Sequence, residues 1–377
     1  MNAWPLVPLG EVLVERKERI GTSDANGIPL LGVSNKEGLH RSAMTRISDM
    51  SRYLRVEREW FAYNPMRVNV GSIGWAHSDD LVGIISPDYV VFSCTPKINP
   101  SLLYWFLTSE AGLRAINRQT AGSVRERLYF GSLARVAVPL PPIAEQRRIV
   151  DRISHLMSRL QCVCTLQAEV DQSIRRLLLS AYQAAIQGAS WQPMSTVAPL
   201  VRRPVEIDPL NSYPELGIRS FGKGSFHKPA LEGSSVGTKK LFRIEEGDLV
   251  FNIVFAWEGA VAVATKDDNG RFGSHRFLTC VVDRQLALPE FLWFHFLTDG
   301  GLERLGVASP GGAGRNRTLA IDKLARISVP IPNMEAQKRF IGLLRSVHGR
   351  NELRASIAVE VAALLPSVLN RAFSGGF

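Results

Sequence analysis

Two long stretches of the chain carry apolar residues at helical spacing and contain almost no helix breakers. Between Pro142 and Pro193 there is no other proline, and the first glycine is Gly188. This pattern predicts one continuous helix over residues 144–187, about 66 Å long at 1.5 Å per residue. Steps of four and three residues separate its apolar positions, which form a heptad seam: Ile149, Ile153, Leu156, Leu160, Val163, Val170, Ile174 and Leu177.

The stretch from residue 335 to about 374 repeats this pattern. The apolar spacing is interrupted at Gly349 to Asn351, and Pro366 lies in the last turns of this stretch. Because each predicted helix has a single apolar stripe, we expect the two to bury their stripes against each other as an antiparallel coiled coil. The seam positions of this second helix are Phe340, Leu344, Val347, Leu353, Ile357, Val361, Leu364 and Val368.

The remaining regions show mixed patterns. Short apolar runs at 249–255 and 261–264, bounded by Gly247-Asp248 and by Asp268 to Gly270, predict strands joined by turns. Aromatic and aliphatic residues recur at three- and four-residue steps over 102–117 and 291–305, which predicts helices. We therefore expect α+β domains.

An internal repeat organises the chain. The segment LARVAVPLP at 133–141 recurs as LARISVPIP at 324–332, and EQRRI at 145–149 recurs as AQKRF at 336–340. Weaker matches pair YWFLT at 104–108 with FHFLT at 294–298, and LGV at 31–33 with LGI at 216–218. A duplication predicts two tandem domains separated by two long helices, with pseudo-twofold symmetry. The expected segments are 1–142, 143–190, 191–332 and 333–377.

Composition adds a partner class. The 377 residues include 45 Lys and Arg against 35 Asp and Glu, a formal charge of +10. Such a charge favours a polyanionic partner, although a generally solvated basic surface gives the same number. The four cysteines form no CxxC pair, so no metal site is indicated. The first residues lack the features of a signal peptide, and the apolar stretch 249–257 is too short to span a bilayer, so we expect a cytoplasmic protein without a membrane partner.

The motif PLPPIAEQRRI at 139–149, which ends a domain and opens a long helix, resembles the junction of type I restriction-modification specificity subunits. Segments 31–38, 247–252 and 364–375 agree with that family, so the resemblance spans essentially the whole chain. The second junction departs from it, because PNMEAQ at 332–337 lacks the second proline and the Glu-Gln pair, although Gln337 is kept.

The resemblance implies a DNA-specificity subunit without catalytic chemistry or a cofactor of its own. It implies that each domain is a target recognition domain that reads one half of a bipartite site in double-stranded DNA. The helices would set the spacing and dock two methyltransferase subunits, and motor-nuclease subunits would join the complex. Adenine methylation with S-adenosylmethionine and ATP-driven cleavage would then be the work of these partners.

Catalytic motifs are incomplete in this sequence. GIRSFGK at 217–223 fits a phosphate-binding loop up to its lysine, but Gly224 follows where Ser or Thr would hold Mg²⁺, and Pro229 interrupts the required helix. Asn64-Pro65-Met66 is a poor match to an adenine methyltransferase element, and Pro87-Asp88 lacks the acidic partner of a nuclease. We expect no catalytic residue and no metal ligand.

Basic loops supply the candidates for DNA contact. Loops 119–127 and 309–317 combine glycines, which allow close approach, with arginines, which grip phosphate or reach guanine in the major groove. From these loops we predict DNA contact by Gln119, Ser123, Arg125, Arg127, Arg315, Asn316 and Arg317. Further candidates are Arg219, Lys223, Lys228, Lys239, Lys240, Lys36, Arg41, Arg67 and Arg276.

Two other functions remain open at this level. A coiled-coil assembly scaffold with an incidental basic surface would show little duplex binding at any ionic strength, whereas a DNA reader should bind with a steep salt dependence. An enzyme that uses the 217–223 loop would be stabilised by nucleotide.

Overall fold

The computed structural model describes residues 4–20, 27–42, 50–120, 127–311 and 317–373 of the chain. The chain divides into two compact units. Unit 1 comprises Met1–Gln167 and Ala355–Phe377, and unit 2 comprises Ala168–Arg354. Both boundaries lie inside long helices, so each unit contains the first part of one long helix and the last part of the other.

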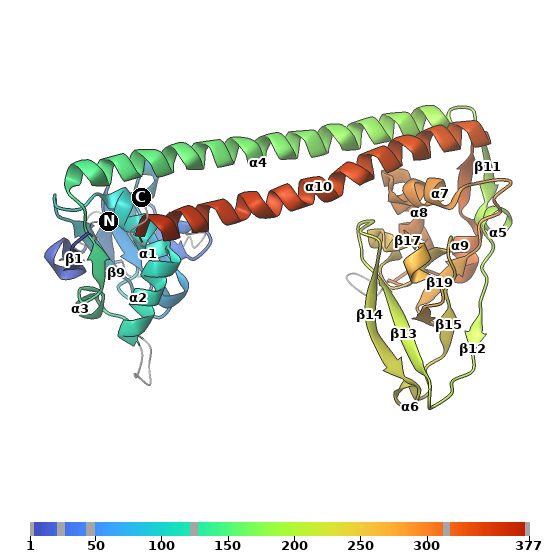
Figure 1. Ribbon diagram of the computed structural model, residues 1–377, viewed down its shortest axis with the longest axis horizontal. Coiled ribbons are helices and arrows are strands. Elements are labelled where there is room, and N and C mark those ends of the chain that lie inside the picture. Colours follow the sequence, from blue (N-terminus) through green and yellow to red (C-terminus); the bar gives the residue numbers. More distant parts are fainter. Residues whose placement is uncertain (1–3, 21–26, 43–49, 121–126, 312–316, 374–377) are drawn as a thin grey trace. The chain divides into compact units, whose positions relative to one another are not determined.

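The two long helices are uninterrupted (Figure 1). α4 spans Ile143–Ile186 and α10 spans Met334–Phe373, which confirms the two helices expected from the apolar spacing. α10 continues through Pro366. The α+β class is also confirmed, because both units combine small sheets with short helices. The division of the chain into four segments stays a prediction.

Unit 1 is built around a four-stranded antiparallel sheet in the order β2-β9-β6-β7. Phe61, Tyr63 and Phe92 from its central strands are fully buried against one another. In the described part of the unit, this sheet is accompanied by the strand pairs β1-β10, β3-β4 and β5-β8. The elements are β1 (Leu6–Pro8), η1 (Leu9–Glu11), β2 (Leu13–Arg16), β3 (Leu31–Ser34), β4 (Gly38–Arg41), β5 (Leu54–Val56), β6 (Trp60–Tyr63), η2 (Val68–Val70), β7 (Ile73–Trp75), η3 (Asp79–Leu81), β8 (Gly83–Ile85), β9 (Val90–Cys94), α3 (Phe130–Leu133) and β10 (Ala137–Pro139).

Unit 2 contains a three-stranded sheet, β17-β16-β19, and a five-stranded sheet, β12-β15-β18-β13-β14. All of these pairs are antiparallel except β13 with β18. β11 pairs with β20 (Ser328–Ile331) next to the second junction. The elements are β11 (Ser190–Pro193), α5 (Met194–Val197), β12 (Pro204–Val205), β13 (Ser212–Ile218), β14 (Ser225–Glu232), α6 (Gly233–Val236), β15 (Leu241–Arg243), β16 (Leu249–Asn252), η4 (Ala256–Glu258), β17 (Val261–Val263), η5 (Lys266–Asp268), β18 (Phe272–Ser274), β19 (Phe277–Cys280) and α9 (Ile321–Arg326).

The sequence predicted one helix over residues 102–117 and one over 291–305, but each of these regions forms two consecutive helices. The pairs are α1 (Pro100–Thr108) with α2 (Glu110–Thr120), and α7 (Pro289–Leu297) with α8 (Asp299–Ala308). Ser109 and Thr298 separate them, because each hydroxyl accepts a hydrogen bond from the amide three residues later and so caps the second helix. The two structures therefore match Ser109 with Thr298. The sequence motifs at 104–108 and 294–298 instead matched Thr108 with Thr298, so the structural alignment is shifted by one residue.

A buried glutamine anchors the start of each long helix. Gln146 and Gln337 each accept one backbone hydrogen bond and donate two, over 2.7 to 3.0 Å. For Gln146 the partners are Asn99, Lys97 and Pro141, and for Gln337 they are Leu288, Leu286 and Pro332. The departure of the second junction from the family motif therefore leaves its anchor intact.

The apolar seam of the long helices is buried only toward the helix ends. In unit 1, Ile149 and Ile153 share a core with the end of α10, and in unit 2, Phe340 and Leu344 share a core with the end of α4. There α1 or α7 supplies a second apolar layer, which the middle turns lack among the described residues. Burial was the wrong prediction for six seam residues that are 38% to 51% exposed. Leu156, Val163, Val170 and Ile357 lie in the uncovered middle turns, whereas Leu177 and Leu364 lie one position away from the covered face, next to Leu178 and Leu365 of the two cores. Leu160, Ile174, Val347 and Val368 are half-buried, and the side chain of Leu353 lies outside those described.

Candidate nucleic-acid interface

In unit 2, a groove of about 470 Å³ brings together three of the cations predicted to contact DNA. Lys228 comes from β14, Lys239 from the segment between α6 and β15, and Arg276 from the turn between β18 and β19. Lys239 and Arg276 are exposed, and Lys228 is half-buried. The one carboxylate among the lining residues is Glu215 of β13, so the groove carries a net positive charge.

Aromatic rings hold Lys228 of the groove and its neighbour Arg219, which does not line the groove. The guanidinium of Arg219 lies 4.9 Å from the ring centre of Phe226, and Nζ of Lys228 lies 6.0 Å from Phe226 and 5.7 Å from Phe277. Phe226 pairs with Gly217 across the two strands, and a Cβ at Gly217 would lie 2.2 Å from the ring. The glycine therefore lets the ring cover β13, and the ring holds both cations by cation–π attraction.

Arg317 reaches the same part of unit 2. Its guanidinium lies 5.3 Å from the ring centre of Trp257 in η4, and the indole N–H of Trp257 donates to the carbonyl of Val254 at 3.0 Å. Val254 itself lines the groove. The predicted glycine- and arginine-rich loop thus ends close to the groove, while its Arg315 and Asn316 lie outside the described residues.

Unit 1 has a groove of about 600 Å³. Four cations line it, namely Arg16, Lys17, Arg19 and Arg127, together with the carboxylates Glu15 and Asp88. Nη1 of Arg127 donates to Oη of Tyr129 at 3.4 Å, and this hydrogen bond raises the pKa of Arg127. Arg127 alone among the four was predicted from sequence, because the others belong to a run of alternating charge that is typical of a solvated strand end. Ser123 and Arg125 lie outside the described residues.

The two grooves lie at the same place in the repeated fold. Asn64 directly follows β6 and lines the groove of unit 1, and Asn252 ends β16 and lines the groove of unit 2. Each Oδ1 accepts a hydrogen bond from the amide two residues later, at 3.0 and 3.1 Å. The backbone amides donate to matching carbonyls, those of Ser72 and Ala260. In the sequence Asn64 is only part of an incomplete catalytic motif, and an asparagine turn is too common a signal to have revealed this equivalence.

The other predicted cations do not line the two grooves. Arg41 contacts Asp80 through its backbone carbonyl at 3.2 Å and its carboxylate at 3.8 Å. Lys36, Arg67, Lys223 and Lys240 are exposed in turns or loops, and Gln119 is half-buried in α2. DNA contact by these residues stays a prediction.

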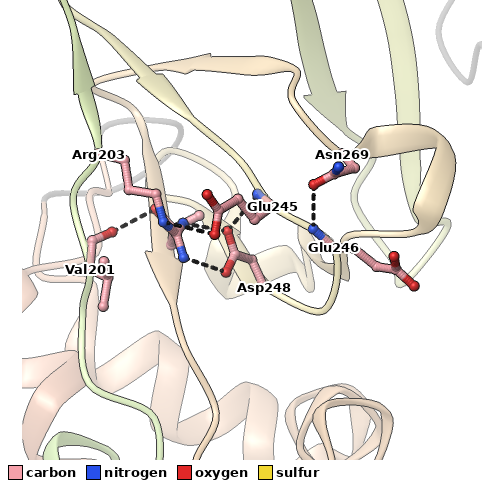
Figure 2. A network of polar contacts seen from close by, with 7 residues as sticks. Val201, Arg203, Glu245, Glu246, Asp248 and Asn269 are labelled. Carbon is pink, nitrogen blue, oxygen red and sulfur yellow. Dashed lines mark hydrogen bonds and ion pairs between the residues drawn. The ribbon is translucent and has the colours of Figure 1, made fainter.

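A buried ion pair anchors the strand that leads to Asn252 (Figure 2). Asp248, just before β16, accepts hydrogen bonds from Nη1 and Nη2 of Arg203 at 2.7 and 3.1 Å and from the amide of Glu245 at 2.8 Å. The carboxylate of Glu245 adds a contact to Arg203 at 3.3 Å. The hydrogen bond to Asp248 raises the pKa of Arg203. These contacts anchor the start of β16, and none of the three side chains lines the groove.

The near-match to a phosphate-binding loop is a β-hairpin. β13 ends at Ile218 and β14 begins at Ser225, so a strand follows the loop where nucleotide binding would require a helix. A nucleotide-hydrolysing enzyme built on this loop was therefore a wrong alternative. Across the described ranges, no group of three or more His, Cys, Asp and Glu side chains is arranged to hold a metal ion. No described helix has the length and apolar character needed to cross a membrane.

Comparison with known proteins gives a partial match in sequence. A family model for the type I restriction modification DNA specificity domain matches residues 82–172, which include the first junction and the first part of α4. The HindI specificity subunit of a type I restriction enzyme from Haemophilus influenzae is 20% identical over 114 residues, or 30% of this chain. The matched segment spans only 25% of that relative's length.

Two solved structures share the fold along the whole chain. One, concerned with complex assembly and conformational transition of the type I R-M system, has a TM-score of 0.68 and 17% identity, covering 100% of this chain and 99% of that one. The crystal structure of the HsdS subunit from Thermoanaerobacter tengcongensis has a TM-score of 0.56 and 18% identity, covering 100% and 98%. The shared fold and the matching family model confirm the resemblance to type I specificity subunits.

Proposed function

We propose that this chain is a type I specificity subunit, which binds a bipartite site in duplex DNA and positions catalytic partners. Each unit reads one half-site through its cationic groove. One observation carries the proposal: both repeats place such a groove at the same strand end, beside Asn64 and beside Asn252. Lys and Arg in these grooves can neutralise phosphates, and their donors can reach base edges.

The chain contributes no bond-making step of its own in this proposal. It acts as an adaptor, so methylation is performed by docked methyltransferase subunits and cleavage by motor-nuclease subunits. Residues 1–142 and 191–332 are separable recognition domains, and each fixes one half of the target.

The long helices set the spacing of the half-sites and provide the docking face for two methyltransferase subunits. In support, the middle of both helices leaves large apolar side chains in water, among them Leu166 at 54% and Val359 at 70% exposure. Apolar surface of this kind on a soluble protein marks an interaction site when it is contiguous. A scaffold without DNA affinity would use the same face, so DNA binding must be tested directly.

The test is selection of duplexes from a randomised pool with the full chain, followed by titration of the selected duplex over a range of salt concentrations. We expect a split consensus and a steep log-log salt slope, to which each neutralised phosphate contributes about 0.9. Replacing Lys228, Lys239 and Arg276 together with Ala should flatten the slope by up to about 3 and change selection in one half only.

The matched control removes the same charge from unit 2 outside the groove, by replacing Lys323, Lys338 and Arg339 with Ala. These exposed side chains lie on α9 and α10. Equal changes of slope in the two triple variants would show that only net charge matters. Failure of the unaltered chain to bind duplex at low salt would favour the scaffold.

A further inference from the structure

Phe221 occupies an unusual position in the loop between β13 and β14. Its φ is +62°, and among the described residues only Glu59 shares a positive φ without being glycine. Its aromatic side chain is 73% exposed. The backbone conformation is costly for a residue with a Cβ, and the exposed ring is costly in water. A residue with two such costs is a candidate for a function that needs its side chain at that place.

The loop holds Phe221 on a fixed support. The amide of Phe221 donates to the carbonyl of Glu258 at 2.8 Å, and the amide of Gly222 donates to the carbonyl of Gly259 at 3.0 Å. Oγ of Ser220 donates to the carboxylate of Glu258 at 3.1 Å. The exposed ring therefore projects from a backbone that is tied to η4 and to the residue after it.

Several cations lie near this support, whose own carboxylate, that of Glu258, accepts the hydrogen bond from Ser220. Arg219 and Lys223 flank Phe221 in the loop, and Arg219 lies over Phe226 beside Lys228 of the groove. In η4, which holds the loop, the ring of Trp257 lies under Arg317. A partner that matches this surface has negative charges on both sides of an apolar slot. A step between stacked base pairs, bordered by phosphates, has this chemistry.

We infer that Phe221 is a wedge that enters a base-pair step of the half-site bound by unit 2 and partly unstacks it. The inference rests on the proposed DNA-reading function and adds a mechanism to it. Phosphate contacts by Arg219 and Lys223 would hold the duplex while the ring is inserted, and the deformation would favour steps that unstack easily. The wedge therefore makes unit 2 sensitive to a base step by its shape.

Unit 1 provides an internal comparison. Its corresponding hairpin joins β3 to β4 through only Asn35, Lys36 and Glu37, which include no aromatic residue. One half-site should therefore be unstacked and the other should not.

The experiment uses the full chain and the duplex selected from the randomised pool. Adenines are replaced one at a time by 2-aminopurine, whose fluorescence rises when the base loses its stacking neighbours. With the unaltered chain we expect a rise at one step in the half-site read by unit 2 and none in the other half. Phe221→Ala should abolish the rise and weaken binding about tenfold. Phe221→Leu should keep part of the fluorescence rise and part of the affinity, because leucine also acts as a wedge.

The matched control is Leu210→Ala, which removes an exposed apolar side chain at the opposite end of the same hairpin. It should change neither fluorescence nor affinity. Phe221→Gly relieves the backbone and should melt at or above the temperature of the unaltered chain while losing the fluorescence signal, which separates loss of the wedge from loss of folding.

Two outcomes overturn the inference, and they differ in whether the proposed DNA-reading function survives. Duplex binding by the unaltered chain without any fluorescence rise, or an undiminished rise in Phe221→Ala, eliminates the wedge and leaves DNA reading intact. Absence of duplex binding by the unaltered chain eliminates DNA reading and the wedge with it.

Discussion

The two units bury the ends of the long helices with different chemistry at matching positions. In unit 1, Phe106 of α1 meets Phe373 at the end of α10 edge to face, with ring centres 5.3 Å apart. The corresponding pair in unit 2 is His295 of α7 and Tyr182 near the end of α4, with Nδ1 and Oη 2.6 Å apart. Both pairs are buried. Both units thus fill these positions with rings, as a hydrocarbon pair in unit 1 and as a hydrogen-bonded pair in unit 2.

The junction glutamines, in contrast, are the same residue in both units. Gln146 accepts a hydrogen bond from one backbone amide and donates to two backbone carbonyls in unit 1, and Gln337 does the same in unit 2. Backbone polar groups are present whatever the side chains are, so the same glutamine can serve both units. The comparison separates positions specified by hydrogen-bond geometry from positions specified by volume.

The start of the central strand shows a third pattern. The carbonyls of Trp60 in unit 1 and Asp248 in unit 2 accept matching hydrogen bonds, each at 2.8 Å, from Ala76 and Ala264. In unit 1 the guanidinium of Arg16 lies 4.9 Å from the ring centre of Trp60, whereas in unit 2 Asp248 forms the ion pair of Figure 2. One unit uses a half-exposed stacking contact where the other uses a buried charge.

The largest expected difference between the units follows from that contrast. Arg203→Ala leaves the carboxylate of Asp248, which is only 3% exposed, without its charged partner, and should destabilise unit 2 by roughly 4 kcal/mol. Arg16→Ala removes a cation–π contact and the hydrogen bond that Nε donates to Oγ of Ser93 at 2.9 Å, and should cost about 1 to 2 kcal/mol in unit 1. Hydrogen exchange in β16 and β6 under mild denaturant would measure the two effects separately. Equal destabilisation would mean that the ion pair contributes no more than the stack.

The junction glutamines should be equally important in the two units. Gln146→Leu and Gln337→Leu keep the side-chain volume but leave one amide and two carbonyls unsatisfied, which should destabilise each unit by roughly 3 kcal/mol. Denaturant unfolding followed by exchange in α1 and α7 would report the two effects. A much smaller effect for Gln337→Leu would show that the altered second junction has found other partners for these groups.

The elements that the sequence predicted best are those with a local signal. The heptad spacing located α4 and α10 to within one residue at each end, because few breakers interrupt them. The same spacing was misleading about burial, as Val163 and Val170 show. An apolar stripe reports that a face is apolar and does not report how far along the helix a covering layer extends.

The grooves required the tertiary structure. Lys228, Lys239 and Arg276 were predicted from their charge, but strand pairing around β14, β15 and β18 brings them together, and no sequence spacing encodes that meeting. Arg16 was missed because an arginine in a mixed-charge run carries no local signal. Asn252 lies in a segment that resembles the family, yet its role in the turn depends on backbone geometry.

The hydrogen-bonded pair of His295 and Tyr182 should make unit 2 sensitive to acid. Burial, with a smaller effect of Arg304, lowers the pKa of His295 from 6.5 to about 4. The folded pKa lies below the unfolded one, so the unfolded chain takes up the proton first as pH falls. The stabilisation is complete above about pH 6.5, and roughly 2 kcal/mol is lost by pH 5 and 3 kcal/mol by pH 4. His295→Phe, which copies Phe106, should flatten this slope in urea unfolding of unit 2. An unchanged slope would assign the acid sensitivity to other groups.

The smallest expected effect concerns a turn that both units share. Glu59 and Gly247 have φ values of +66° and +85°, and their amides donate to the matching carbonyls of Ala76 and Ala264. A residue with a Cβ pays about 1 to 2 kcal/mol in this conformation, whereas glycine loses about 0.5 to 1 kcal/mol through the greater freedom of the unfolded chain.

Glu59→Gly should therefore stabilise unit 1 by about 0.5 to 1 kcal/mol, and Gly247→Ala should destabilise unit 2 by a similar amount. A Cβ at position 247 would also lie 2.6 Å from Nη2 of Arg284, but that side-chain end can move, so the backbone conformation dominates. Unit-resolved hydrogen exchange in β6 and β16 would detect both changes. If Glu59→Gly lowered the stability of unit 1, the exposed carboxylate would have to contribute more than the strain of its backbone, and the turn would be held differently in the two units.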